Sequence, residues 1–154
     1  MEKDKLHIGW REWLSLPTLQ IPAIKAKIDT GARTSALHAF FVEPFAVDGV
    51  KMVRFDIHPL QKNSDIVLTC EAPIKDERLV TDSGGHSEMR FVIETMAVFS
   101  GVEWPIEVTL TNRDNMRFRM LLGRTALAEK FLVDPGASYC GGRGLGKKYK
   151  KRSL

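Results

Sequence analysis

The sequence has few cysteines and no long apolar run. Its 154 residues include two cysteines, Cys70 and Cys140, a number more typical of a reducing compartment than of a disulfide-stabilised scaffold. No apolar segment reaches the length of a membrane span, and the charged N-terminal residues lack the hydrophobic stretch of a signal peptide. We therefore expect a cytoplasmic protein with no membrane association.

Compact metal and nucleotide motifs are also missing. The four histidines, His7, His38, His58 and His86, are not spaced as His-Glu-Xaa-Xaa-His, and the cysteines do not form Cys-Xaa-Xaa-Cys. No Walker-type phosphate loop is present, and the glycines at 141–144 are not followed by a strand or helix pattern. We expect no metal and no cofactor, although ligands from distant strands could still converge in space.

The charge is unevenly distributed along an otherwise ordinary globular composition, 44% hydrophobic and 27% charged. The formal net charge is +4, and residues 141–154 alone contribute +6, which leaves −2 for the rest. We expect one domain over residues 1–140 and a basic, disordered tail over 141–154. The tail could contact nucleic acid, a ribosome or an acidic substrate, or it could be solvated without a partner.

Apolar and polar residues alternate in many short segments separated by turn signals, a pattern typical of strands. Two short helical stretches are expected, at 32–39 (or a turn there) and at 125–130. We predict an all-β protein, a small closed β-barrel with one short C-terminal helix. The expected strands are residues 10–16, 24–28, 52–58, 66–72, 78–81, 90–98, 104–111 and 117–122.

The segment Ile28-Asp29-Thr30-Gly31-Ala32 is the candidate functional centre. An apolar strand leads into Asp-Thr-Gly, which places a carboxylate at a tight turn where glycine relaxes the backbone restrictions. A second apolar strand that ends in glycine, Leu121-Leu122-Gly123-Arg124, follows far downstream, and a short helical pattern comes after it. Between them, Ser83-Gly84-Gly85-His86-Ser87 has the composition of a hairpin tip.

These segments resemble the catalytic turn, the supporting hydrophobic-Gly-Arg segment and the flap tip of retropepsins, the single-lobed aspartic proteases. The segments 8–13, 25–39 and 131–135 are similar to a retropepsin-like bacterial family often labelled the RimK-associated "ATP-dependent zinc protease" family. The resemblance covers residues 6–138. It implies Asp29, Thr30 and Gly31 as catalytic residues, and Ala32, Arg33, Gly84, Gly85 and Arg124 as substrate-binding residues.

One carboxylate cannot carry out the aspartic-protease reaction, which needs two acids that share one proton. A chain of this length has no room for two lobes, so a second Asp29 must come from a second copy in a homodimer. Asp82-Ser83-Gly84 is a rival second acid within the chain. We favour the flap interpretation for it, because its glycine pair fits a hairpin tip.

Several cations are expected near the site, because Arg33 stands where the viral retropepsins that the chain resembles usually have an acid. Lys25, Lys27, Arg78 and Arg90 are further candidates, although alternation directs some strand lysines away from the cleft. The family resemblance implies association with an ATP-grasp ligase that adds glutamates to a ribosomal protein. We therefore predict an aspartic endopeptidase that acts on acidic or glutamate-rich peptides.

Two alternatives remain open. The chain could be a catalytically silent retropepsin-fold module that binds peptides, or it could be a zinc-dependent protease. Ser35 and Cys140 are weaker nucleophile candidates, because no base is arranged beside them in the sequence.

Overall fold

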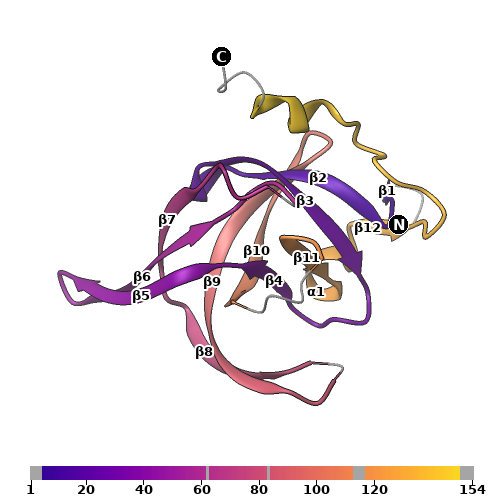
Figure 1. Ribbon diagram of the computed structural model, residues 1–154. Helices are drawn as coiled ribbons and strands as arrows, with labels where there is room; N and C mark the ends of the chain where they lie inside the picture. The colour runs from indigo at the N-terminus through magenta and orange to yellow at the C-terminus, as the bar shows by residue number, and fades with distance from the viewer. Residues whose placement is uncertain (1–4, 62, 83, 113–116, 150–154) are drawn as a thin grey trace.

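The fold is described from a computed structural model (Figure 1) that covers residues 5–61, 63–82, 84–112 and 117–149. The strands are β1 (Leu6–Ile8), β2 (Arg11–Leu16), β3 (Ile21–Asp29), β4 (Ser35–His38), β5 (Phe40–Val47), β6 (Val50–Ile57), β7 (Leu68–Pro73), β8 (Asp76–Thr81), β9 (Ser87–Phe99), β10 (Val102–Thr111), β11 (Met120–Gly123) and β12 (Phe131–Val133). The helix α1 is Arg124–Leu127, and Pro17–Leu19 and Gly144–Lys148 are 3-10 helices.

Six strands pair in a closed circuit. The order is β10-β4-β11-β3-β2-β9, and β9 pairs with β10 to complete the ring. β8 extends this sheet as a hairpin with β9, which projects from the body of the molecule (Figure 1). This arrangement confirms the predicted all-β fold with one short helix. A closed circuit also pairs strand edges that would otherwise be exposed.

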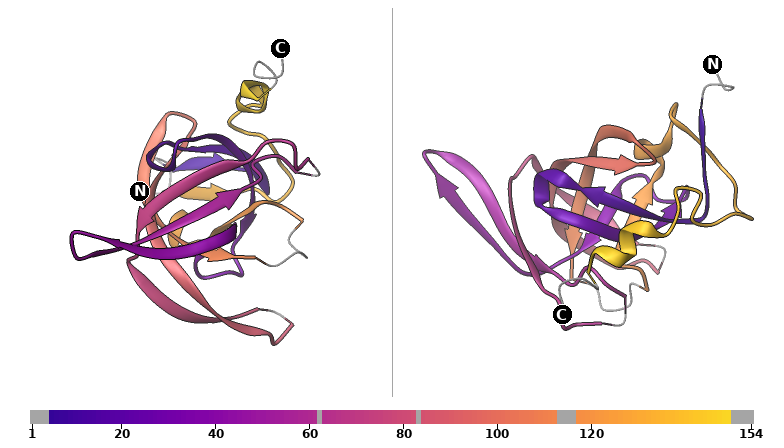
Figure 2. Two further views of the ribbon diagram at one scale, coloured as in Figure 1. Left: turned by 60° about the vertical axis from the view of Figure 1, so that its left-hand side comes forward. Right: turned by 90° about the horizontal axis from the view of Figure 1, so that it is seen from above.

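Two smaller sheets flank the ring. β5, β6 and β7 form an antiparallel three-stranded sheet, whose β5–β6 hairpin extends outward in Figure 2. β1 and β12 pair in parallel, which joins the N-terminal strand to the segment that follows α1. Among the described residues, no helix is long and apolar enough to cross a membrane.

Alternation of apolar and polar side chains explains why these segments are strands. In β2, Glu12, Leu14 and Leu16 are buried while the residues between them are partly exposed. β3 is apolar on its inner face through Ala26 and Ile28, and Lys27 is exposed on the other face. One contiguous core lies inside the ring and extends under β6 and β7. Burial of these apolar side chains is the main force that holds the strands in register.

The predicted helical stretch at 32–39 is wrong, because residues 35–38 form strand β4. β4 lies between β10, which it meets in parallel, and β11, which it meets antiparallel, and all four of its residues are buried. Pairing on both edges overrides the helical propensity of Ala36 and Leu37. The short helix predicted at 125–130 is present but ends earlier, at Leu127.

The C-terminal residues differ from the expected disordered tail as far as residue 149. Gly144–Lys148 is a 3-10 helix, and Tyr149 is only 2% exposed. The Tyr149 hydroxyl donates to the Ala23 carbonyl oxygen and accepts from the Ala23 amide at 3.2 Å. Gly146 packs against the Trp13 ring. The basic charge of the segment predicted disorder, but Tyr149 binds the segment to β3 through these contacts with Ala23. Residues 150–154 lie outside the described residues.

Candidate active site

Strand β3 ends at Asp29, and the chain turns there. The Gly31 amide donates a hydrogen bond to Asp29 Oδ1 at 3.0 Å, and the Ala32 amide donates to the Asp29 carbonyl oxygen at 3.2 Å. The bond from Gly31 orients the carboxylate at the end of the strand, and the bond from Ala32 closes the turn. Asp29 is partly buried, whereas Thr30 and Gly31 are exposed. The predicted catalytic turn is therefore a defined structural element.

The segment from β11 to α1 supports this turn. β11 pairs with β3 in parallel, so that Gly123 lies opposite Asp29. The Gly123 amide donates to the buried Ser35 hydroxyl at 3.0 Å. The next amide, from Arg124, donates to the Ala32 carbonyl oxygen at 2.8 Å. Ser35 therefore supports the turn through its hydroxyl.

Thr125 fixes the far end of the same loop. Its amide and its hydroxyl both donate to the Arg33 carbonyl oxygen, at 3.1 and 2.8 Å. Gly123 must be small here, because a Cβ at that position would lie 2.7 Å from the Thr34 carbonyl carbon and 2.9 Å from the Ala32 oxygen. The predicted packing of the Leu-Leu-Gly-Arg segment against the Asp29 turn is thus present.

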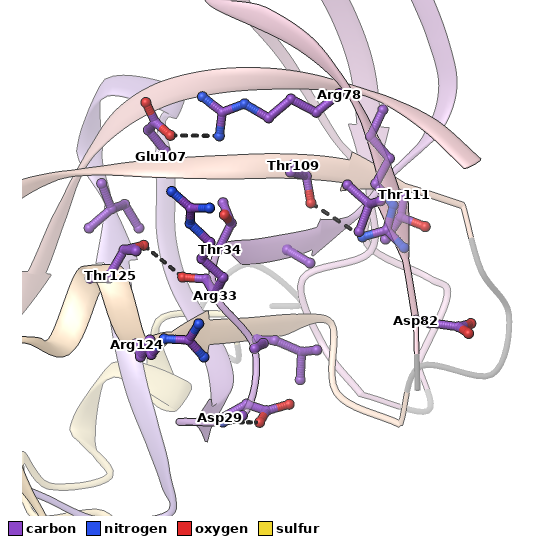
Figure 3. Close-up of a pocket in the computed structure, with 18 of the residues that line it drawn as sticks. Asp29, Arg33, Thr34, Arg78, Asp82, Glu107, Thr109, Thr111, Arg124 and Thr125 are labelled. Atoms are coloured by element: carbon purple, nitrogen blue, oxygen red, sulfur yellow. Dashed lines mark hydrogen bonds and ion pairs between the residues drawn. The ribbon is translucent and has the colours of Figure 1, made fainter. Parts of the chain in front are cut away.

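A cleft of about 1650 Å³ opens above this turn (Figure 3). Its size suits several residues of an extended peptide. Residues from four parts of the fold line it: the Asp29 turn (29 and 31–34), the β8–β9 hairpin (75, 78–82, 84, 86, 90 and 94), strand β10 (105–107, 109 and 111), and the support segment (117, 118, 121 and 124–126), together with Trp10, Lys27 and Ala36.

The β8–β9 hairpin covers one side of the cleft, as expected for a flap. At its tip, Asp82 Oδ1 accepts hydrogen bonds from the Gly84 and His86 amides, both at 2.9 Å. Gly85 has φ +84°, a left-handed conformation that favours glycine. Asp82 therefore organises the turn, and Figure 3 shows it well apart from Asp29. Ser83 of the predicted tip lies outside the described residues.

Ion pairs join the base of this hairpin to β10. Lys75 Nζ lies 2.9 Å from carboxylate oxygens of both Glu94 and Glu107, and Arg78 Nη1 lies 3.0 Å from Glu107 Oε1. Hydrogen bonds from Lys75 and Arg78 lower the pKa of Glu107 below its usual value. The cluster therefore keeps its charges at neutral pH and connects the flap to β10.

Buried polar contacts continue this connection deeper in the cleft. Arg90 is 9% exposed, and its Nε lies 2.6 Å from Glu88 Oε1. Arg90 Nη1 donates to the Thr109 hydroxyl at 3.3 Å, and that hydroxyl donates to the Ser35 carbonyl oxygen at 3.3 Å. The flap is thus linked through β10 to the strand that follows the Asp29 turn.

Four cations of the cleft form no ion pair within the described ranges: Lys27, Arg33, Arg117 and Arg124. The structure brings Lys27, Arg33, Arg78 and Arg90 to the cleft as expected, but not Lys25, which lies over the Trp13 ring. Since Arg78 and Arg90 are paired with acids, three of the four unpaired cations belong to the Asp29 strand, its turn or α1: Lys27, Arg33 and Arg124.

Of the proposed substrate-binding residues, Ala32, Arg33, Gly84 and Arg124 line the cleft together with Asp29 and Gly31. Thr30 and Gly85 are not among its lining residues. Sequence reasoning missed the contribution of Trp10 and Phe118, whose rings meet edge to face at 6.0 Å. The Gly-Trp dipeptide was visible in the sequence, but nothing in it signalled that Trp10 reaches the cleft.

No cluster of three or more potential metal ligands occurs among the residues whose positions are described. The histidines come from separate elements: His7 from β1, His38 from β4 and His86 from the flap tip, while His58 stacks on Phe40 at 4.5 Å.

Burial first, and then the charge of Asp56, raise the pKa of the Cys70 thiol to about 12, so that it is neutral and inert at neutral pH.

The chain is similar to a solved structure and to several curated proteins. A solved structure of a protein of unknown function from Legionella pneumophila has a TM-score of 0.74 over 88% of this chain and 98% of that one, at 23% identity, which shows the shared fold. Curated relatives from Shewanella pealeana and Parasynechococcus marenigrum, both called "Probable alpha-L-glutamate ligase", are 47% identical over 91% and 88% of this chain.

The chain spans about 30% of the length of these curated relatives, 31% and 29% in the two cases. The ligase name therefore describes proteins about three times as long as this one. A family model described as "Retropepsin-like aspartic endopeptidase RimB" matches residues 7–143, which include the Asp29 turn, the flap and the support segment. The chain belongs to this RimB-like family of retropepsin-like aspartic endopeptidases.

Proposed function

We propose that this protein is an aspartic endopeptidase that works as a homodimer, with one Asp29 from each subunit. The observation that carries the proposal is the setting of Asp29. Its carboxylate is oriented by the Gly31 amide, and it faces a cleft of about 1650 Å³ beneath a hairpin flap.

The need for a partner follows from the acids of the cleft. Besides Asp29, the described lining residues include Asp82, Glu94 and Glu107. Asp82 accepts hydrogen bonds from the flap tip, and the two glutamates are bound to Lys75 and Arg78. None of the three forms a hydrogen bond with Asp29 in the described structure. A second Asp29 on a two-fold axis supplies the missing acid.

In such a pair, two nearby carboxylates cannot both be ionised, so they share one proton. The ionised Asp29 takes a proton from a bridging water as that water attacks the peptide carbonyl carbon. The protonated Asp29 of the other subunit donates a hydrogen bond to the developing oxyanion. Arg33, Ala32 and Gly84 line the path of the substrate backbone, and flap closure excludes water.

We propose acidic, glutamate-rich peptides as the substrate class. Lys27, Arg33, Arg117 and Arg124 present positive charge without an acidic partner in the described structure, which favours a carboxylate-bearing ligand. The glutamate-ligase name of the curated relatives supports the same chemistry. A ribosomal protein that carries added glutamates and an ATP-grasp ligase are the partners we propose. The two free thiols support a reducing, cytoplasmic setting.

The replacement Asp29→Asn tests the catalytic role. We expect cleavage of a fluorogenic glutamate-rich peptide to fall by at least about 10³-fold with the fold unchanged, because removal of a catalytic acid or nucleophile has effects of this order. Asp82→Asn is the matched control and should retain most of the activity. Wild-type cleavage rates in Asp29→Asn would refute the proposal.

Oligomeric state provides a second, independent test. Sedimentation of wild-type protein with a peptide inhibitor should show a dimer, and mixing excess Asp29→Asn subunits with wild type should suppress activity through mixed dimers. A fully active monomer would exclude the shared dyad.

Two other functions have distinct signatures. A catalytically silent peptide-binding module of the same fold would bind acidic peptides but show no Asp29-dependent cleavage. A zinc-dependent protease would lose activity with chelators and contain stoichiometric metal.

A further inference from the structure

The outer face of the β2–β3 hairpin carries cations opposite one another. In the antiparallel register, Arg11 lies opposite Lys27 and Trp13 lies opposite Lys25. Like charges directly opposite across two strands destabilise a sheet unless an anion lies between them. None of these three cations forms an ion pair within the part of the chain that the structure describes. The neighbouring acid, Glu12, is fully buried on the opposite face of β2.

The C-terminal segment adds an aromatic ring and a fourth cation to this face. Three cationic groups lie over the Tyr139 ring. Their distances to the ring centroid are 4.9 Å for the Arg11 guanidinium, 5.6 Å for Lys25 Nζ and 4.5 Å for the Arg143 guanidinium. The three cations repel one another, and their attraction to the ring offsets little of that repulsion because the site is partly exposed. We call Arg11, Lys25, Lys27, Tyr139 and Arg143 the basic ridge.

The ridge is rigidly built. The Tyr139 amide donates to the Arg11 carbonyl oxygen at 3.0 Å, and the next two amides, of Cys140 and Gly141, donate to the buried Glu12 carboxylate at 2.8 and 3.2 Å. Figure 2 shows the C-terminal segment lying over β2 and β3. In addition, Arg11 Nε is buried without a hydrogen-bond partner among the described residues. Such a preorganised set of donors suits an anionic ligand.

The ridge is continuous with the cleft. Lys27 belongs to both, and Trp10, which lines the cleft, has the Arg11 guanidinium 4.6 Å from its ring centroid. The Ile28 amide donates to the Trp10 carbonyl oxygen at 2.8 Å, which joins this edge to the strand that carries Asp29. A chain that leaves the cleft past Trp10 and Lys27 therefore meets the ridge next.

We propose that the basic ridge is an exosite, a second binding surface that holds the acidic flank of an extended peptide while another part of that peptide occupies the cleft. This inference rests on the proposed peptidase function. Lys25 and Lys27 are two residues apart on one strand, about 6.6 Å, and alternate side chains of an extended glutamate-rich peptide have the same spacing. Continuity with the cleft favours a peptide flank over nucleic acid, the other class of polyanion.

The test measures binding in the Asp29→Asn background, so that cleavage is not needed. Fluorescein-labelled peptides of four and twelve glutamates, about 13 and about 40 Å when extended, are titrated by fluorescence anisotropy. Lys25→Gln with Arg143→Gln should weaken binding of the long peptide about tenfold, roughly threefold for each exposed charge. The short peptide should be unaffected. The matched control, Lys51→Gln with Lys130→Gln, removes two exposed positive charges outside the cleft and the ridge and should change neither.

Each outcome is decisive. The exosite would be overturned if the ridge variant lost the same affinity for the long and the short peptide. It would also be overturned if the ridge variant and its control changed the affinity equally. If the ridge variant lost binding of a single-stranded RNA oligonucleotide but kept full binding of the long peptide, the ridge would be assigned to nucleic acid. This result would also overturn the exosite. Length-dependent peptide binding in a protein whose wild type never cleaves peptides would keep the exosite and refute the peptidase.

Discussion

Gly123 and Asp29 lie directly opposite each other where β11 pairs in parallel with β3. The pairing places the backbone of the support segment against the loop that follows the carboxylate, and a Cβ on Gly123 would lie 2.7 Å from the Thr34 carbonyl carbon. The position of the acid therefore depends on a residue that has no side chain.

Gly123→Ala should displace residues 32–34 and the Asp29 turn with them. We expect a loss of about 1–3 kcal/mol of unfolding free energy, as for overpacking elsewhere, and at least a tenfold loss of peptidase activity. Urea denaturation and peptide cleavage measure the two effects. Gly144→Ala is the control, because a Cβ there has open space around it. Unchanged activity in Gly123→Ala would show that the loop tolerates the shift.

Asp82→Ala removes the acceptor of the Gly84 and His86 amides at the flap tip. We expect a several-fold rise in KM with a smaller change in kcat, because the flap contacts the substrate but does not react with it. Asp82→Asn keeps an acceptor oxygen and should raise KM less than Asp82→Ala. If both variants reduced kcat as severely as Asp29→Asn, Asp82 would have to be counted among the reacting groups.

The Lys75–Glu107–Arg78 ion pairs should make the flap sensitive to acid. The pKa of Glu107 is lowered from 4.5 by hydrogen bonds from Lys75 and then Arg78. The ionised carboxylate therefore stabilises the fold above pH 4.5, and this contribution disappears as the pH falls through the lowered pKa. Hydrogen exchange of residues 76–81, measured relative to the intrinsic rate at each pH, should accelerate over that range. Glu107→Gln should show the faster exchange already at pH 7, and equal rates in both proteins would contradict the connection.

Tyr149→Phe tests whether the C-terminal segment belongs to the folded unit. The variant loses two hydrogen bonds to Ala23, and we expect a loss of about 0.5–1.5 kcal/mol for each bond removed. The readout is the urea midpoint. Removal of residues 141–154 should cost more, since it also uncovers the Trp13 ring that contacts Gly146. A midpoint identical to wild type in both variants would mean that this segment adds nothing to stability.

The two thiols should differ in reactivity. Cys70 is 3% exposed, and the pKa of its thiol is raised to about 12. Cys140 lies at the surface, and the pKa of its thiol is raised first by partial desolvation and then by a hydrogen bond with Glu12. Titration with a thiol reagent at pH 8 should modify one thiol in the native protein and two in denaturant. Rapid modification of both in the native state would show that the β6–β7 sheet opens readily.

The local parts of the site were predictable from sequence, because each is a contiguous motif with its own geometry. Asp29 at a strand end and Gly84–Gly85 at a hairpin tip are examples. Strand β4 was not predictable in this way, because its conformation is imposed by β10 and β11. The pairing of Arg78 with Glu107 and the gathering of Arg11, Lys25 and Arg143 around Tyr139 depend on register between segments far apart in the chain.

The strand order has a consequence for the time at which activity can arise during synthesis. The Asp29 turn takes its hydrogen bonds from Arg124 and Thr125, and Trp10 donates its amide to Ala137. A nascent chain on the ribosome therefore carries the acid early but lacks the backbone that orients it until these later residues have emerged. Contacts so distant in sequence also slow folding. The Asp29 turn therefore acquires its orienting contacts only after translation has passed Thr125.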